Sequence, residues 1–329
     1  MMKHLKHIFC GMLIACLMVS VIPAEDADAA AKKFRRGTSM YDENYFLTSS
    51  ENRVEINGLY FWHDSEKERL FCSKSADGKG TELHLSSFSA GRRLETMMLT
   101  DGTWVYYVLD DYEKNQSYIC REKYDGTGFQ KVVTFNDAFL NPQLVSIYNN
   151  VLYYNLQTFN TEGPYGDKLY SVGLKSGTKK LRTSKLRVSY STGSSRYLYG
   201  TSKSESGTIT LKAYDCKEKK VNKIVAFKSG EGGILGTYDG KLYYYKGHSE
   251  TNDITVYRTT LSGTGKRIKV VTLPTTYMTA DLVENRIYFD YPNDGGHPFY
   301  DVSTGDIGLL KNEDEYRVAL STNYKARFN

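Results

Sequence analysis

Several signals of common folds and enzyme classes are scarce or missing in this chain of 329 residues. Proline occurs six times, and no segment carries apolar residues at helical spacing. So few prolines argue against a disordered linker, and the missing helical period favours β-structure. Neither a Gly-x-Ser-x-Gly nor a His-Glu-x-x-His motif is present, so the sequence lacks the signals of the hydrolases that use them.

Long apolar runs are missing except at the N-terminus. Lys3 and Lys6 precede an apolar run over residues 8–22, and the small-residue stretch "AEDADAAA" follows. This pattern predicts a bacterial-type signal peptide over 1–29 and hence a secreted, extracellular protein. "LIAC" at 13–16 resembles a lipoprotein box, but apolar residues follow Cys16, so lipidation there is the less favoured alternative.

Tyrosine is abundant and recurs at a regular spacing. An aliphatic residue followed by two aromatic residues, or a scrambled version of this pattern, is centred on Tyr60, Tyr106, Tyr153, Leu198, Tyr243 and Tyr288. Turn residues such as Asn57-Gly58 and Asp239-Gly240 precede most of these anchors, and further strand-like segments follow them. Six repeats of about 45 residues with four strands each predict a six-bladed β-propeller, with β-sandwich and β-solenoid as the weaker alternatives.

The repeats cover residues 53–329, predicted to be one propeller domain. Residues 30–52 are assigned to an N-terminal segment, with a ring-closing strand as one alternative. The strand-like C-terminal "YRVALSTNYKARF" leaves open a seventh, composite blade built from both termini.

The repeat text also resembles a known family. "LYFWHDSEKERLFCSKSADGKGTELHL" (59–85) is similar to a repeat of the YWTD propellers of low-density-lipoprotein-receptor type, and closer to a related family of bacterial secreted propellers of unknown function. The resemblance extends over all six copies and implies the propeller fold. It departs in detail, because Trp62 is the only tryptophan near its anchor, and it implies little about function.

Gly-containing turns end the third strand of most repeats, for example "YDGTG" (124–128) and "LSGTG" (261–265). A phosphate loop would need a following helix, and a calcium loop would need more oxygen ligands in every copy. We therefore expect Asp125 to be a turn residue. Cys72 and Cys120 occupy equivalent places in successive repeats, too far apart for a disulfide, so they and Cys216 are expected to be buried free thiols.

Charge separates when it is sorted by the predicted ends of the blades. The loops between second and third strands sum to −7, whereas the third-to-fourth turns with the outer strands sum to +11. Lysine on outer strands also discourages edge-to-edge pairing, which is the structural alternative. The contrast predicts a basic side centred on repeats three to five that faces anionic cell-wall polymer or a membrane surface, through Lys179, Lys180, Lys266 and Arg267.

Other candidate ligand contacts are tyrosines in the acidic loops, whereas most anchor tyrosines are expected to pack in the core. The loop candidates are Tyr112, Tyr165 and Tyr291. The four histidines after the signal peptide lack metal-site spacing, so no metal and no cofactor is expected. The one carboxylate pair suited to catalysis is Glu55 with Asp281, on the first strands of repeats one and six.

The sequence thus favours a non-catalytic secreted or cell-surface propeller that binds a protein or glycan. The alternative is a glycan-processing hydrolase or lyase with carboxylates at the channel mouth. Removing the signal peptide takes the net charge from +5 to +6, too little for a dedicated nucleic-acid binder, so no nucleic-acid partner is expected.

Overall fold

The structure is a computed structural model, and the chain divides into two units, Met1–Lys32 and Lys33–Asn329. The residues that it describes all lie in the second unit: 35–36, 54–56, 58–64, 69–75, 77–83, 92–137, 140–157, 168–190, 196–204, 206–227, 232–248, 253–274, 280–283, 285–289 and 297–310.

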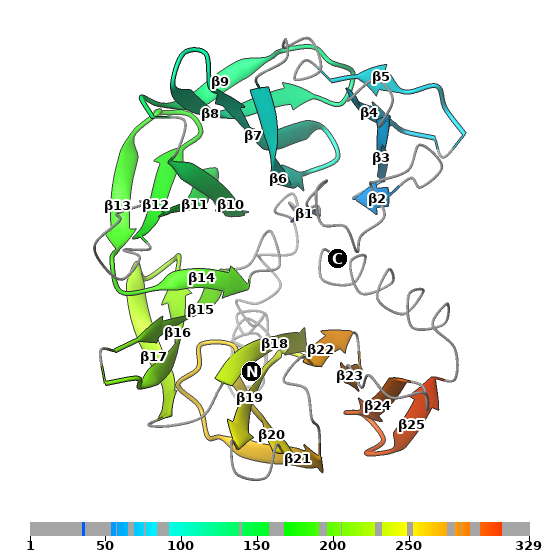
Figure 1. The fold of residues 1–329 in the computed structure, drawn as a ribbon, viewed down its shortest axis with the longest axis vertical. Helices are drawn as coiled ribbons and strands as arrows, with labels where there is room; N and C mark the ends of the chain where they lie inside the picture. Colours follow the sequence, from blue (N-terminus) through cyan, green and yellow to red (C-terminus); the bar gives the residue numbers. More distant parts are fainter. Residues whose placement is uncertain are drawn as a thin grey trace, which may run out of the picture. The chain divides into compact units, whose positions relative to one another are not determined.

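The described residues form antiparallel β-sheets, each built around four strands consecutive in the chain (Figure 1). The first sheet contains β2 (Val54–Ile56), β3 (Leu59–Asp64), β4 (Arg69–Ser73) and β5 (Thr81–Glu82). The second contains β6 (Arg92–Thr100), β7 (Trp104–Asp111), β8 (Gln116–Lys123) and β9 (Gln130–Phe135). The third contains β10 (Asn141–Tyr148), β11 (Val151–Gln157), β12 (Lys168–Gly173) and β13 (Lys179–Thr183).

The later half of the chain repeats this order. The fourth sheet contains β14 (Arg187–Tyr190), β15 (Tyr197–Lys203), β16 (Ile209–Asp215) and β17 (Lys220–Phe227). The fifth contains β18 (Gly232–Tyr238), β19 (Lys241–His248), β20 (Asp253–Thr260) and β21 (Ile268–Pro274). The sixth contains β22 (Ala280–Val283), β23 (Arg286–Phe289), β24 (His297–Asp301) and β25 (Ile307–Leu310). Six successive four-stranded meanders make this a β-propeller, as the repeat predicts.

A short extra strand lies at the start of the described chain. β1 (Arg35–Arg36) pairs antiparallel with β6, so it adds a fifth strand to the second sheet. The proposed composite blade depends on the C-terminal segment, which lies outside the described residues, and therefore stays a prediction. Within the described ranges we find no helix with the length and apolar character needed to cross a membrane.

The repeated aromatic anchors lie on the second strand of each sheet. In four sheets an anchor ring lies directly opposite an aromatic ring of the third strand: Trp62 with Phe71, Tyr154 with Tyr170, Tyr244 with Tyr257 and Tyr288 with Phe299. The centroids of these pairs are 5.6–5.8 Å apart. Such cross-strand pairs stabilise a sheet beyond the area that they bury.

Apolar clusters join consecutive sheets, and the anchors contribute to them as the sequence predicts. The cluster between the fourth and fifth sheets, for example, combines Tyr199 and Leu211 with Leu242 and Tyr244. Some anchor hydroxyls reach polar partners: Tyr107 donates to the buried Glu122 carboxylate at 2.6 Å, and Tyr199 donates to the Leu261 carbonyl at 2.7 Å. These tyrosines are therefore core residues, and their rings are closed to a ligand.

The third-to-fourth turns are structural, as expected. Asp125 accepts hydrogen bonds from the backbone N–H (3.0 Å) and hydroxyl (2.6 Å) of Thr127, while Gly126 and Gly128 take the positive φ values of a tight turn. A second bond recurs in four sheets, where the N–H at the end of the third strand donates to a carbonyl of the first-to-second turn. Its donor–acceptor pairs are Tyr124 with Thr103, Leu174 with Asn150, Cys216 with Arg196 and Val302 with Asn285.

The three cysteines of the propeller are free and buried, as predicted. Burial raises the pKa of Cys72, Cys120 and Cys216 to about 12, so the thiolate form is scarce at neutral pH. Since the thiolate is the reactive form, these side chains act as core residues.

Candidate anion-binding rim

The predicted loop contacts are only partly visible. Tyr112 lies in the turn between β7 and β8 and is 42% exposed, which suits a ligand contact. Tyr165 and Tyr291 lie outside the described residues, as does most of the acidic loop 155–168. Tyr112 is therefore the one loop tyrosine whose exposure the structure establishes.

The predicted carboxylate pair lies on two first strands. Glu55 is on β2 opposite Tyr60, and Asp281 is on β22 opposite Tyr288. Their side chains lie outside the described residues, so a catalytic pair stays a prediction. Among the described His, Cys, Asp and Glu residues, no group of three or more is placed to hold a metal ion.

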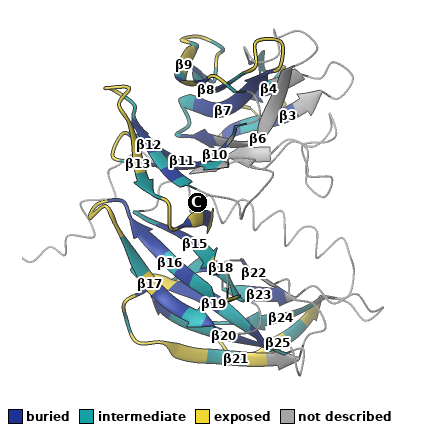
Figure 2. Ribbon diagram, turned by 60° about the vertical axis from the view of Figure 1, so that its left-hand side comes forward, coloured by how far each residue is buried: buried dark blue, intermediate teal, exposed yellow. Residues whose placement is uncertain are grey.

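Cations gather along the outer side of the third, fourth and fifth sheets. The outer strands β13, β17 and β21, with their adjoining turns, carry long basic side chains, and Figure 2 shows exposed residues concentrated there. We call this set, together with Lys212 of the neighbouring β16, the basic rim. Its members are Lys175, Lys179, Lys180, Arg182, Lys185, Lys212, Lys217, Lys219, Lys220, Lys223, Lys266, Arg267 and Lys269.

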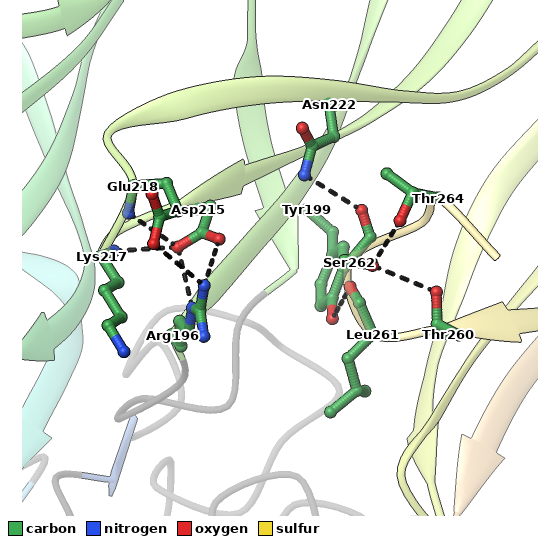
Figure 3. Close-up of polar contacts among 10 residues, drawn as sticks. All are labelled: Arg196, Tyr199, Asp215, Lys217, Glu218, Asn222, Thr260, Leu261, Ser262 and Thr264. Carbon is green, nitrogen blue, oxygen red and sulfur yellow. Dashed lines mark hydrogen bonds and ion pairs between the residues drawn. The ribbon is translucent and has the colours of Figure 1, made fainter. Parts of the chain in front are cut away.

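The acids in the same stretch of the fourth sheet are already paired. Arg196 binds both oxygens of Asp215 (2.9 and 2.7 Å) and lies 3.7 Å from Glu218 (Figure 3). Burial would raise the pKa of Asp215, but the Arg196 hydrogen bonds and the backbone N–H groups of Glu218 and Lys217 hold it below its usual value. Within the described ranges, no member of the basic rim forms a salt bridge with a carboxylate.

Two contacts place the outer strand of the fourth sheet beside the β20–β21 turn. The Asn222 side-chain amide donates to the Ser262 carbonyl at 3.3 Å, next to the Tyr199–Leu261 bond (Figure 3). Gly263 lies against Ile224, so close that a Cβ there would meet its side chain. Lys220 and Lys223, which flank this contact, therefore share one region with Lys266 and Arg267.

The four predicted rim residues are all exposed, but they are not equivalent. Lys179 Nζ donates to the Thr134 carbonyl at 3.3 Å and lies 5.8 Å from the Phe135 ring, so it also ties the third sheet to the second. The positive charge of Arg267 acts against the burial that raises the pKa of Tyr244 to about 12. Lys180 and Lys266 have no such contact in the described part of the chain.

Sequence reasoning missed one group in the rim. Lys212 of β16 is half-buried, lies directly opposite Lys223 of β17, and donates from Nζ to the Lys185 carbonyl at 2.6 Å. Its place depends on a register shift between Leu211 and Lys212. A strict two-residue alternation does not reveal such an irregularity, so no signal in the sequence marked the pairing.

A buried carboxylate, Asp301, lies at the third-to-fourth turn of the sixth sheet, and its contribution to stability can be tested. Asp301 accepts bonds from Ser303 Oγ (2.5 Å), from the N–H groups of Ser303 and Thr304, and from Asn285 Nδ2 (2.8 Å). The Ser303 hydroxyl is the largest cause of a pKa lowered to about 2.

Because the folded-state pKa lies below the unfolded one, Asp301 stabilises the fold above pH about 4, and this contribution disappears as the pH falls through about 2. We expect Asp301→Asn to lower the free energy of unfolding by about 1–3 kcal/mol at pH 7 and by much less near pH 2. Urea unfolding at both pH values measures this difference. A loss of equal size at both would show that the charge is not responsible.

Solved structures similar to this chain belong to larger proteins. They include a structure from a study of prolyl endopeptidases (TM-score 0.53, 12% identity, 91% of this chain and 53% of that chain), the tricorn protease (0.53, 11%, 84% and 31%) and a puromycin hydrolase (0.50, 11%, 84% and 45%). The chain thus spans about half the length of the first of these and less of the other two.

At these identities the likeness shows the fold alone. No protein-family model matches the chain, and no curated protein matches its sequence. The resemblance to the secreted YWTD-related propellers therefore stays a prediction beyond the β-propeller fold itself.

Proposed function

We propose that this protein is a non-catalytic, secreted or cell-surface propeller whose basic rim binds an anionic polymer of the cell envelope. The observation that carries the proposal is the run of cations on three neighbouring outer strands without described carboxylate partners. Asp215 and Glu218, the acids nearest to them in the chain, share Arg196 as their partner instead, so they offset only one of the rim's positive charges. The rim is therefore a net positive surface.

The choice of side chains supports a polymer ligand held by charge. The rim contains eleven lysines and two arginines. Lysine presents a mobile point charge, whereas arginine is the usual choice for a fixed bidentate fit. Long side chains on exposed outer strands can follow a flexible polyanion without a preformed pocket, and such a surface also accelerates the encounter.

Protection of sheet edges alone is the competing explanation of the lysines. It accounts for exposed lysines on β13, β17 and β21. It does not account for Lys212, which is half-buried on an inner strand, opposite another lysine. A like-charged pair at directly opposite positions destabilises a sheet. The presence of this pair therefore favours a binding role, in which an anionic ligand relieves the repulsion between the two lysines.

Retention on an immobilised anionic cell-wall polymer tests the function. We expect the bound fraction to fall steeply with salt, with affinity dropping at least about tenfold between about 50 and about 200 mM, because binding releases counterions. A neutral glucan matrix is the control and should retain nothing. Retention that is equal on both matrices, or independent of salt, would contradict the proposal.

The alternative function, a glycan-processing hydrolase or lyase, depends on the carboxylates of Glu55 and Asp281.

A further inference from the structure

Three lysines meet where the third and fourth sheets adjoin. Lys185 belongs to the link between β13 and β14, Lys212 to β16 and Lys223 to β17. Lys212 is paired directly with Lys223 in the ladder, and its ammonium group is held by the Lys185 carbonyl at 2.6 Å. One ammonium proton is used in this bond, which leaves two donors for another partner. We call these residues the lysine triad.

Gly200 lies directly opposite Lys212 on β15 and has no side chain that could cover the stem of the lysine. The same row of the sheet continues through Val188 on β14. Lys212 therefore lies across the middle of its sheet, toward the third sheet, whereas the ends of Lys185 and Lys223 are exposed.

The electrostatic environment of Lys212 is unfavourable without a ligand. Burial lowers its pKa, and the charges of Lys185 and Lys223 lower it further. Among the other titratable groups at this junction, Tyr153, Tyr214, Cys216 and Arg182 act on one another, and the Asp215 carboxylate, which is paired with Arg196, also acts on Tyr214 and Cys216. Burial raises the pKa values of the two tyrosines and the cysteine, so they supply no negative charge at neutral pH.

We propose that the lysine triad is a binding site for a dianionic phosphate group, a phosphomonoester carried by the anionic polymer. The inference rests on the proposed function, because it names the chemical group that one part of the basic rim binds. The ammonium group of Lys212 keeps two donors, the charges of Lys185 and Lys223 act on it, and no carboxylate in the described part of the chain forms a salt bridge with any of the three.

Phosphate suits this arrangement better than a carboxylate does. A phosphomonoester carries up to two negative charges and three acceptor oxygens, which suit three positive charges that act on one another. A carboxylate offers two oxygens and one charge, so most of the repulsion between the lysines would remain. A phosphodiester likewise carries one charge, which separates the two phosphate classes experimentally.

Calorimetric titration of the full chain with methyl phosphate, dimethyl phosphate and acetate tests the site. We expect methyl phosphate to bind at least about tenfold more tightly than the two monoanions. Lys212→Gln and, separately, Lys223→Gln should each weaken methyl phosphate by about 10- to 100-fold, because each removes a charge-assisted hydrogen bond. Lys203→Gln, at an exposed position of the same sheet, is the matched control and should bind as the unaltered protein does.

Proton linkage separates a ligand contact from a structural role. A bound dianion raises the pKa of Lys212 again, so binding at mildly alkaline pH should take up protons, seen as a dependence of the heat on the buffer's ionisation enthalpy. Lys212→Arg should keep the binding but lose the proton uptake, because the guanidinium stays charged. Binding without proton uptake in the unaltered protein would overturn the role of Lys212.

Vesicles containing phosphatidic acid present the same group on a lipid. Equal affinity for vesicle-borne and soluble phosphomonoester is expected for a polymer source, whereas a preference above about tenfold for vesicles would overturn that source. If the protein is retained on the polymer in a salt-sensitive way but Lys212→Gln and Lys203→Gln bind methyl phosphate equally well, the lysine triad is refuted and the proposed function is supported. If methyl phosphate binds at the triad but the protein is not retained on the polymer, the proposed function is refuted and the phosphate site is supported.

Discussion

Replacing Lys179, Lys180, Lys266 and Arg267 together by glutamate is expected to weaken retention on the anionic polymer by at least about 100-fold at low salt. Each change alters the local charge by two, and an exposed ion pair contributes about 0.2–1 kcal/mol. Reversing four cations removes these attractions and adds repulsions, for a total of about 3 kcal/mol or more. The binding isotherm at fixed salt measures the loss.

A matched control separates this effect from the net charge of the protein. Four exposed lysines outside the basic rim can be reversed in the same way: Lys74, Lys79, Lys203 and Lys241. The two variants carry the same net charge, so a general electrostatic attraction would weaken both alike. We expect the control variant to lose less than about a tenth as much affinity. Equal losses would refute a localised rim.

Replacing Gly200 by alanine is expected to lower the free energy of unfolding by about 3 kcal/mol or more. A Cβ at this position would overlap the backbone carbonyl of Arg187 on the neighbouring strand and approach the Leu186 side chain. Because a backbone atom cannot move aside as a side-chain end can, β14 would have to shift away from β15. The urea midpoint of the variant measures the cost.

Gly177 provides the comparison for this substitution. It lies in the β12–β13 turn with φ of 66°, and no atom lies within 4 Å of the place that a Cβ would take, so an alanine there meets backbone strain alone. That strain costs about 1–2 kcal/mol. We therefore expect Gly200→Ala to be clearly the more damaging change. Equal urea midpoints for the two variants would show that β14 can shift away from β15 without lowering the free energy of unfolding.

The repeated elements of the fold follow directly from the sequence. The anchor at Tyr154 predicted a core strand, and its ring packs between strands as expected. The turn at Asp125 was predicted from its glycines and from the absence of a following helix. Such features can be predicted from the sequence, because turn geometry and strand alternation depend on residues a few positions apart.

Features that depend on register or on distant partners could not be derived in this way. The pairing of Lys212 with Lys223 requires the irregularity after Leu211, and the burial of Glu122 requires Tyr107 from the adjacent strand. The sequence indicated the sign and the location of the basic rim, through Lys180 and its neighbours. It did not indicate which of these cations is half-buried, because that depends on the sheet packed beside it.

A backbone hydrogen bond recurs between the end of the third strand and the first-to-second turn of four sheets, and it affects how freely the exposed side chains of the rim can be exchanged. In the second, third, fourth and sixth sheets this bond joins two backbone groups, as between Tyr124 and Thr103, so its formation does not depend on the identity of the side chains around it. Exposed rim positions such as Lys180 and Lys220 can therefore be exchanged without loosening the turns beneath them. A scaffold of this kind lets related chains acquire different ligands while their blades stay the same.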